Sequence, residues 1–426
     1  MAPEGTEPAP APAKDPAQWT DAEWQELDWA IGRAFSPAAP VSNRDLFAGR
    51  TDQMRQLIDV AYEIGRHAVL YGERGVGKTS LASIMKLIHE GQEKTDLAVR
   101  VNCDGSDSYD TIWRKAFNEI SITSEQQEAG FRGESRRSAV PLGKLVPSDK
   151  LAPNDIRRVL EPISRSKHTV IFIDEFDRVR GSKVKAMFAD TIKMFSDQLL
   201  PATIVLVGVA DNVGELIAEH HSVERALLQI HMPRMSRDEL AEIVERGLAS
   251  VDMNIQDEGL GRITQLSQGL PHYAHLLGQA SARQAVADQR LNVSLFDVEA
   301  AIPQVIKDAH QSIVDLHQRA IHSTRETLYP EVLLAAALAK GDDLGFFAAA
   351  DVRAPLTAIM GKPYDIPAFS RHLNALSEEE RGSVLQKRGQ QRKFRFRFTN
   401  PLLQPYVVMR GLEKGLLRPE LLERFS

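Results

Sequence analysis

The apolar and polar positions follow two periods along the first half of the chain. Apolar runs with strand character lie at residues 67–71, 97–102, 169–173 and 203–209, and the run at 169–173 is uninterrupted. Apolar residues recur at helical spacing between and beside these runs, at 51–65, 80–88, 109–120, 154–166 and 184–200. Strands that do not alternate and are separated by helices are typical of a parallel sheet covered on both faces. The pattern therefore predicts an α/β domain.

The helical period dominates after residue 235. Residues 236 to about 290 are predicted to be helical from a capping box, Ser236 with Glu239, and a helical connector follows at 294–323. The pattern then predicts three helices, two short strands and a closing helix, at 331–340, 351–360, 366–377, 384–388, 394–398 and 400–415. Phe and Arg alternate in the second strand, so Arg395 and Arg397 are expected to face outward.

The N-terminal region has a different composition. Residues 1–18 alternate Ala and Pro with few charges, which is typical of a disordered tail. A capping box, Thr20 with Glu23, then opens a helix with the apolar residues Trp24, Leu27, Ile31 and Phe35 on one face. We expect this helix to dock on a neighbouring subunit or on its own domain, and the second is favoured.

One internal stretch, residues 121–150, lacks a clear period. It is longer than most connections inside compact domains, so it is either functional or mobile. Arg132, Arg136 and Arg137 could contact a phosphate backbone, but a solvated loop is the favoured interpretation.

Composition limits the class of protein. The 426 residues exceed one ordinary core, and 43% hydrophobic with 26% charged residues is typical of a soluble globular protein of two or three domains. No apolar run approaches the roughly 20 residues needed to span a bilayer, so we expect a cytoplasmic protein without membrane contact. Cys103 is the single cysteine, which excludes an intrachain disulfide and a cysteine-based zinc site.

The charge is unevenly distributed. The formal net charge is −6, yet residues 387–397 hold six basic residues and no acidic one. The six are Lys387, Arg388, Arg392, Lys393, Arg395 and Arg397. This asymmetry predicts a local anion-binding face near the C-terminus.

Residues 72–79 fit the phosphate-binding pattern G-x-x-x-x-G-K-[ST] at every fixed position, between a predicted strand and a predicted helix. Glycines let successive backbone N–H groups turn toward phosphates, and the helix N-terminus adds positive potential. Lys78 is expected to reach the β- and γ-phosphates and Thr79 to offer its hydroxyl to Mg²⁺. The predicted phosphate-binding residues are Gly72, Gly75, Val76, Gly77, Lys78, Thr79 and Ser80.

Two acids, Asp174 and Glu175, end the apolar run about 100 residues downstream of this loop. A buried strand that ends in acids is expected where a sheet opens onto a nucleotide site. Asp174 would hold Mg²⁺ with Thr79, and Glu175 would polarise the attacking water as general base. The sequence therefore predicts ATP and Mg²⁺ as cofactors.

Both motifs and the elements after them, over roughly residues 44–290, resemble AAA+ ATPases. The resemblance is to the part of that superfamily shared by replication-initiator ATPases and STAND-type signalling ATPases. Residues 47–50 are similar to the box that such proteins place against the adenine, which implies nucleotide contacts from Gly49 and Arg50. Residues 206–212 resemble the fourth strand and sensor-1 motif, which makes Asn212 a catalytic candidate, with Asp211 a less favoured substitute.

The resemblance implies two further elements of the site. Arg225 stands where the family carries its arginine finger, although a surface pairing with Glu224 or Glu219 is the alternative and Arg234 competes for the role. Pro271 lies in a Gly-x-Pro element of STAND-like lids, near base and ribose. His272 replaces the sensor-2 arginine of initiator ATPases, which is consistent with slow hydrolysis because imidazole is a weaker phosphate partner.

Helices followed by a basic hairpin resemble a winged helix. If it binds DNA, its third helix would enter the major groove and the hairpin would follow phosphates. The candidate DNA contacts are Arg371, Lys387, Arg388, Arg392, Lys393, Arg395 and Arg397. The alternatives are a winged helix that contacts only protein and a basic edge that discourages edge-to-edge association.

The predicted domains are an N-terminal tail and helix (1–43), an AAA+ core (44–235), a helical lid (236–293), a connector (294–323) and a winged helix (324–426). The predicted function is an ATP-dependent, DNA-associated ATPase that acts as a nucleotide-controlled assembly switch and forms homo-oligomers through its ATP sites. The alternative is a STAND-like signalling or defence ATPase whose winged helix contacts protein, including an effector. A scaffold that binds ATP without turnover is the third possibility.

Overall fold

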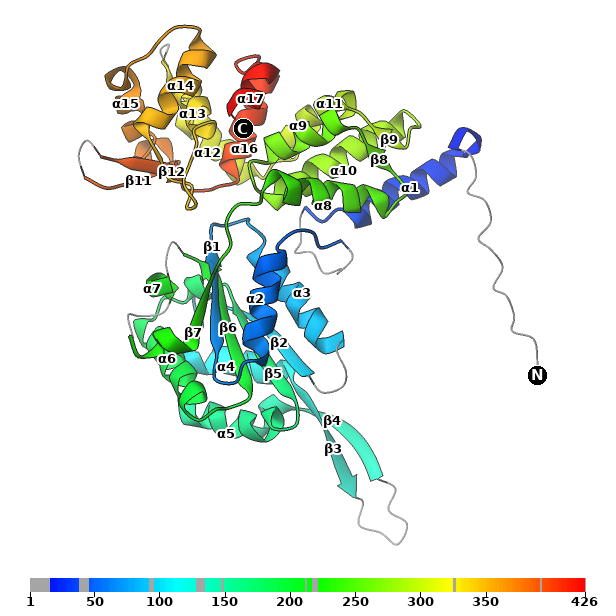
Figure 1. The fold of residues 1–426 in the computed structure, drawn as a ribbon, viewed down its shortest axis with the longest axis vertical. Coiled ribbons are helices and arrows are strands. Elements are labelled where there is room, and N and C mark those ends of the chain that lie inside the picture. The colour runs from blue at the N-terminus through cyan, green and yellow to red at the C-terminus, as the bar shows by residue number, and fades with distance from the viewer. Residues whose placement is uncertain are drawn as a thin grey trace.

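The computed structural model describes residues 16–37, 46–91, 96–127, 135–146, 149–210, 213–216, 221–324, 327–390 and 393–425. Figure 1 shows a sheet domain in the lower part, with a helical lid and a C-terminal domain above it. Most of the predicted N-terminal tail lies outside the described residues.

The sheet domain is built on five parallel strands in the order β2-β5-β6-β1-β7. They are β1 (His67–Gly72), β2 (Asp96–Asn102), β5 (His168–Asp174), β6 (Ala202–Val209) and β7 (Leu227–His231). Their apolar runs are buried on both faces, because successive side chains enter different cores: Val170 and Phe172 in one, Ile171 and Ile173 in the other. The predicted parallel sheet of an α/β domain is confirmed.

Helices cover both faces of this sheet (Figure 1). One face carries α2 (Thr51–Tyr62) and α3 (Lys78–Gly91), and the other α4 (Tyr109–Glu119), α5 (Pro153–Ser164) and α6 (Ser182–Asp197). Short helical turns follow the strands at η3 (Phe176–Arg178), α7 (Val213–Leu216) and η4 (His221–Ala226).

A polar hairpin occupies the stretch predicted to be a loop, so that prediction was wrong. Strands β3 (Ser121–Gln127) and β4 (Ser135–Pro141) pair antiparallel and project from the sheet domain, followed by η2 (Leu142–Leu145). Their composition of Ser, Thr, Gln and Arg gives no apolar alternation, which is why the sequence pattern did not reveal them.

The lid consists of α8 (Arg237–Ala249), α9 (Asp257–Ser267), α10 (Pro271–Ala287) and α11 (Leu295–Lys307), with a small parallel pair, β8 (Asn254–Ile255) and β9 (Asn292–Val293). The capping box of Ser236 with Glu239 is present. Helix α1 (Asp21–Ala34), preceded by η1 (Pro16–Gln18), packs on α8 and α10 of the same chain with its predicted apolar face buried. The helix therefore packs into the hydrophobic core of the lid in its own chain.

The C-terminal domain follows α12 (Gln311–Ile321). It contains α13 (Tyr329–Ala337), β10 (Phe347–Ala348), α14 (Ala349–Met360), α15 (Ile366–Ala375), η5 (Glu379–Arg381), β11 (Leu385–Arg388), β12 (Arg395–Phe398), α16 (Leu403–Glu413) and α17 (Pro419–Phe425). The strands form an antiparallel sheet in the order β10-β12-β11. Helix, strand, two helices and a hairpin follow one another in the order expected of a winged helix. The two-residue β10 was not predicted.

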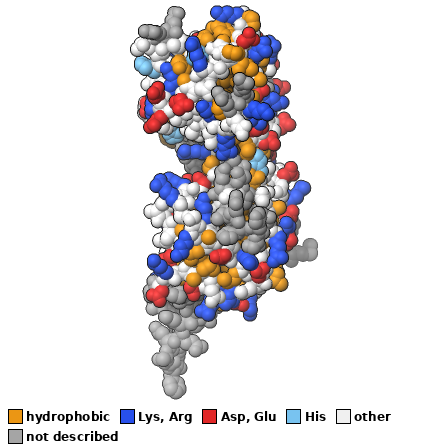
Figure 2. Space-filling model, turned by 90° about the vertical axis from the view of Figure 1, so that its left-hand side faces the viewer, with side chains coloured by type: hydrophobic (Ala, Val, Ile, Leu, Met, Phe, Trp, Pro, Cys, Tyr) orange, Lys and Arg blue, Asp and Glu red, His pale blue; other side chains and the backbone are white. Residues whose placement is uncertain are grey.

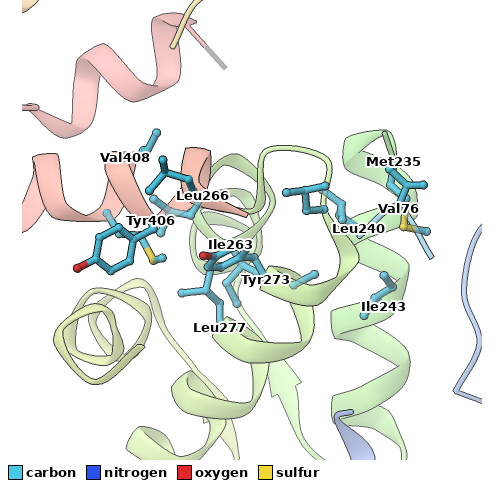
Figure 3. Close-up of a cluster of buried hydrophobic side chains, with 14 of the residues drawn as sticks. Val76, Met235, Leu240, Ile243, Ile263, Leu266, Tyr273, Leu277, Tyr406 and Val408 are labelled. Carbon is cyan, nitrogen blue, oxygen red and sulfur yellow. The ribbon is translucent and has the colours of Figure 1, made fainter. Parts of the chain in front are cut away.

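The C-terminal domain packs directly on the lid. In Figure 3, Tyr406 and Val408 of α16 lie beside Leu266 and Ile263 of α9, within one cluster of buried apolar side chains. The lid and C-terminal domain thus share a core. No helix in the described part of the chain is long and apolar enough to cross a membrane.

Candidate nucleotide site

A cavity of about 490 Å³ lies at the carboxyl edge of the sheet, under the lid and beside the N-terminal segment. Most of the predicted nucleotide and metal residues line it: Arg50, Gly75, Val76, Gly77, Lys78, Thr79, Ser80, Asp174, Glu175, Pro271 and His272. Two other predicted residues, Gly49 and Gly72, are not part of its lining. Ser36 and Pro37 line the cavity and were not foreseen, because their approach depends on how α1 docks.

The phosphate loop begins at a glycine that close backbone packing requires. Gly72 has φ 152°, and a Cβ there would stand 2.4 Å from the carbonyl oxygen of Met232. Its packing, rather than a ligand contact, accounts for the glycine at this position. Helix α3 starts at Lys78, so its N-terminus faces the cavity.

The Lys78 ammonium is buried within the loop that it is expected to serve. Its Nζ donates to the carbonyl oxygens of Gly72 at 3.0 Å and Glu73 at 2.6 Å. Burial lowers the pKa of Lys78 to about 8, against the opposing effect of the Asp177 and Asp174 carboxylates. The cation therefore lies in a poorly solvated position, where a phosphate would be a strong partner.

Asp174 is buried, and both of its carboxylate oxygens accept hydrogen bonds. Its Oδ2 accepts from Arg100 Nε at 3.1 Å and Nη2 at 3.0 Å, and its Oδ1 accepts from the Glu175 N–H at 2.8 Å. Arg100 was missed by the sequence reasoning. It reaches Asp174 because β2 and β5 are neighbours, with Asn102 level with Asp174.

Glu175 follows in a left-handed backbone conformation, with φ 55°. Its Oε2 accepts a hydrogen bond from Arg178 Nη1 at 2.8 Å. Both side chains are about half exposed, at 46% for Glu175 and 56% for Arg178, and both residues line the cavity. Arg178 was also missed.

The donor set fits Mg²⁺. Thr79 and Asp174 line one cavity and offer a hydroxyl and a carboxylate, which are the oxygen ligands that this ion prefers. Because Arg100 already contacts one oxygen of Asp174, that carboxylate is suited to hold the ion through water. The described part of the chain contains no group of three or more His, Cys, Asp and Glu side chains that could hold a metal ion by themselves.

The box at residues 47–50 connects the lid to the phosphate loop. The Gly49 N–H donates to Glu242 Oε2 at 2.8 Å and the Arg50 N–H to Glu239 Oε1 at 3.0 Å. The buried Arg50 guanidinium donates to the carbonyl oxygens of Val76 at 2.9 Å and Pro233 at 2.6 Å. Arg50 therefore shapes the cavity wall through backbone contacts.

His272 lines the cavity and also contacts the N-terminal segment. Its Nδ1 lies 2.7 Å from the carbonyl oxygen of Pro37, and burial is the main cause that lowers the pKa of this imidazole. The neutral ring can donate one hydrogen bond to Pro37 and is a weak partner for phosphate.

The arginine-finger candidate lies on the surface. The Arg225 side chain is 83% exposed and its Nη2 lies 3.5 Å from Asp197 Oδ1, a partner that the sequence alternatives did not include. An exposed pair of this length contributes little stability, so it does not hold the guanidinium in one position. Asn212, Asp211, Arg392 and Arg132 lie outside the described residues.

Arg234, the competing finger candidate, is engaged inside its own chain. Its Nε lies 2.7 Å from Glu73 Oε2 in the phosphate loop, and its Nη1 donates to Gln404 Oε1 at 2.7 Å and to the Gln268 carbonyl oxygen at 3.1 Å. Gln404 Nε2 in turn donates to the Ala337 carbonyl oxygen at 2.8 Å. One arginine thus joins the phosphate loop, the lid and the C-terminal domain.

A second contact also joins these three parts. The Tyr273 hydroxyl on α10 donates to the Leu402 carbonyl oxygen at 2.7 Å. A Cβ at Gly75 would lie 3.4 Å from Leu402 Cδ2, so Leu402 packs over the phosphate loop. The C-terminal domain therefore contacts the nucleotide site of its own chain.

Several of the predicted DNA contacts have partners within the C-terminal domain. Arg395 pairs with Asp342 at 3.1 Å, Arg397 donates to Gln386 at 2.7 Å and Lys387 pairs with Glu378 at 3.7 Å. The Arg388 guanidinium lies 5.2 Å from the Phe346 ring centre, and Arg371, Arg388 and Lys393 are exposed. On the face that Figure 2 shows, basic side chains are mixed with acidic and hydrophobic ones.

The chain is similar to one protein family model and to several known proteins. Residues 35–337 match the family model described as novel STAND NTPase 1. Lon protease 2 of Bacillus subtilis is 22% identical over 254 residues, covering 56% of this chain and 44% of the relative. The Holliday junction branch migration complex subunit RuvB of Lacticaseibacillus casei is 25% identical over 211 residues, covering 50% of each. The chain spans about half the length of these curated relatives.

Two solved structures are similar over most of the chain. Cdc6p from Pyrobaculum aerophilum aligns with a TM-score of 0.45 and 15% identity, covering 91% of this chain and 98% of that one. The ORC2 protein of Aeropyrum pernix aligns with a TM-score of 0.47 and 14% identity, covering 92% and 98%.

Proposed function

Because the chain belongs to the novel STAND NTPase 1 family, we propose that it is a Mg²⁺-dependent, slow ATP hydrolase whose bound nucleotide controls its assembly. The observation that carries this proposal is the convergence of Lys78, Thr79, Asp174 and Glu175 on one cavity. These four residues supply a phosphate-binding cation, metal ligands and a general base.

The proposed reaction is water attack on the γ-phosphorus. The new bond joins the water oxygen to phosphorus, the bond to the β–γ bridging oxygen breaks, and Glu175 accepts the water proton. Lys78 stabilises charge on the phosphates, and Mg²⁺ held by Thr79 and Asp174 would neutralise them further. Arg225 of an adjacent subunit is proposed to complete the site, with Asn212 contacting the γ-phosphate or the water.

Phosphate release tests the proposed hydrolysis. We expect Glu175→Gln to lower kcat by about 100-fold or more, because it removes the general base. Its ATP affinity should stay close to the wild-type value, whereas Lys78→Ala should lose affinity as well. Equal phosphate release from the wild type and Glu175→Gln would contradict the proposal and leave the scaffold that binds ATP without turnover.

For the C-terminal domain, we propose duplex DNA as one partner. Support comes from the exposed Arg371 on α15 and Lys393 beside β12, which belong to the elements expected to approach DNA. Arg395 and Arg397 are poorer candidates because Asp342 and Gln386 already engage them. Affinity for DNA should fall steeply with salt.

Charge reversal tests the DNA proposal. Arg371→Glu with Lys393→Glu should abolish DNA binding at low salt, since two attractive contacts with phosphates become repulsive. The matched control, Lys183→Glu with Lys193→Glu, makes the same change in net charge on the exposed face of α6 and should bind as the wild type does. No binding by the wild type at low salt, or an equal loss in both variants, would contradict the proposal.

A second candidate function for this domain is supported by its contacts. Arg234 and Leu402 tie it to the phosphate loop of its own chain, which favours a STAND-like switch whose C-terminal domain reports the nucleotide state to a partner protein. In this function, ATP would change the contacts of Glu73 and Gly75 with the C-terminal domain. DNA would then have no effect on assembly.

A further inference from the structure

Each of the two neighbouring acids at the end of β5 is paired with its own arginine. Arg100 binds Asp174 and Arg178 binds Glu175, with shortest distances of 3.0 Å and 2.8 Å. Asp174 is buried, whereas the Glu175 pair is half exposed at the cavity wall. The second pair therefore joins the proposed general base to Arg178, which has no role in the reaction proposed above.

Among the residues that the structure describes, four Lys and Arg side chains line the cavity: Arg50, Arg74, Lys78 and Arg178. Arg50 donates to the carbonyl oxygens of Val76 and Pro233, so its guanidinium is committed to the wall. Lys78 is the lysine of the phosphate loop, and Arg74 is exposed on that loop. Arg178 is the cation beside the acid expected to activate water.

Breaking the ion pair between Arg178 and Glu175 costs little free energy. Exposed ion pairs contribute about 0–1 kcal/mol to stability, because water already solvates both charges. A terminal phosphate carries more charge than a carboxylate and offers two oxygens to the two donors of a guanidinium. When ATP is present, Arg178 is therefore expected to leave the Glu175 carboxylate and to bind the γ-phosphate instead.

The backbone around Glu175 allows this exchange without rearrangement. The Glu175 N–H is held by Asp174 Oδ1, and the Arg178 N–H donates to the Glu175 carbonyl oxygen at 2.9 Å. The backbone is thus held in place at both residues, and only the side chains of Glu175 and Arg178 need to move.

We infer that Arg178 contacts the γ-phosphate of ATP within the same subunit and that this contact takes it off Glu175, which is then free to accept the water proton. This inference rests on the proposed ATP hydrolysis. It assigns Arg178 two linked effects: ATP binds more tightly than ADP, and the general base is released only when a γ-phosphate is present.

The test compares Arg178→Gln with the wild type. Affinity is measured by displacement of a fluorescent nucleotide with ADP and with a non-hydrolysable ATP analogue, both with Mg²⁺. We expect affinity for the analogue to fall about tenfold, the size of one charge-assisted hydrogen bond, with ADP affinity unchanged. The kcat should fall as well, and Arg178→Lys should recover part of both losses.

The control is Arg180→Gln, which removes the same charge from an exposed position outside the cavity lining and should leave both affinities and kcat unchanged. A higher kcat in Arg178→Gln with unchanged affinities would overturn the inference, since Arg178 would then only restrain Glu175. Equal losses for both nucleotides, or no change, would also overturn it. Failure of the proposed hydrolysis has a separate signature: wild type and Lys78→Ala would release phosphate equally.

Discussion

At the scale of single residues, the base of the sheet domain contains a histidine that cannot be protonated without loss of stability. His67 in β1 is fully buried, and its Nδ1 accepts the Ile204 N–H at 3.0 Å. Burial lowers the pKa of His67 to about 3, from about 6.5 in the unfolded chain. Between these values the unfolded state binds more protons, so stability falls as the pH falls.

We predict that lowering the pH from 7 to 5 decreases the free energy of unfolding by about 2 kcal/mol through His67 alone, because this residue gains a proton on unfolding. In His67→Asn, an amide oxygen can accept the Ile204 N–H, and the side chain does not titrate. Urea unfolding at both pH values should show that the variant loses about 2 kcal/mol less than the wild type. An equal loss in both proteins would show that His67 does not titrate on unfolding.

Single residues also show which parts of the candidate site could be predicted from the sequence. The phosphate loop, Asp174 and Glu175 were predictable, because their spacing and apolar flanks are local in the chain. The pairs of Arg100 with Asp174 and Arg234 with Glu73 were not, because they depend on which strands are neighbours and on how the lid closes. The pair of Arg178 with Glu175 is local, but its position at the cavity follows only from the fold.

At the scale of elements, one aromatic side chain at the end of the N-terminal helix packs tightly into the lid. Phe35 is buried against two glycines, one in α8 and one in α10. A Cβ at Gly247 would stand 2.6 Å from the Phe35 ring, and one at Gly278 would stand 2.7 Å from it. These glycines create the space into which the end of α1 docks, directly before the cavity-lining Ser36 and Pro37.

We predict that the change in unfolding free energy caused by Gly278→Ala depends on whether residue 35 is Phe or Ala. In the wild type it should destabilise by about 1–3 kcal/mol through overpacking. With Phe35→Ala the clash is gone, and the same change should be neutral or stabilise by up to about 1 kcal/mol through helix propensity. Denaturant unfolding of the wild type, Gly278→Ala, Phe35→Ala and the double variant measures the effect of Gly278→Ala in both backgrounds.

Gly261→Ala in α9 provides the control, because a Cβ there meets no atom within 4 Å. It should stabilise both backgrounds equally, by up to about 1 kcal/mol. A Gly278→Ala effect of the same sign and size in both backgrounds would contradict the proposed packing.

Elements also show where pattern reasoning failed. The apolar sheet strands and the capped helices were predictable because burial on two faces and capping both leave local signals. The β3–β4 hairpin was missed because its strands are polar, and β10 because two residues carry no period. Short or polar strands are specified by their partners rather than by their own sequence.

At the scale of the whole molecule, the phosphate loop of the candidate site is linked to three parts of one chain. The sheet supplies the phosphate loop and the acids, the lid supplies Pro271 and His272, and the C-terminal domain lies against the loop through Leu402 and Gln404. A ligand that alters the phosphate loop therefore acts on all three parts. Such an arrangement can convert the nucleotide state into a change of shape or assembly.

The most direct test of this account is the particle mass of Glu175→Gln with ATP and Mg²⁺, with and without duplex DNA. We predict a monomer without nucleotide and a larger, defined assembly with ATP; Lys78→Ala, which should not retain ATP, should stay monomeric. Assembly that also requires DNA would support the DNA proposal, and assembly indifferent to DNA would support the STAND-like switch. An unchanged mass in Glu175→Gln at saturating, bound ATP would contradict nucleotide-controlled assembly.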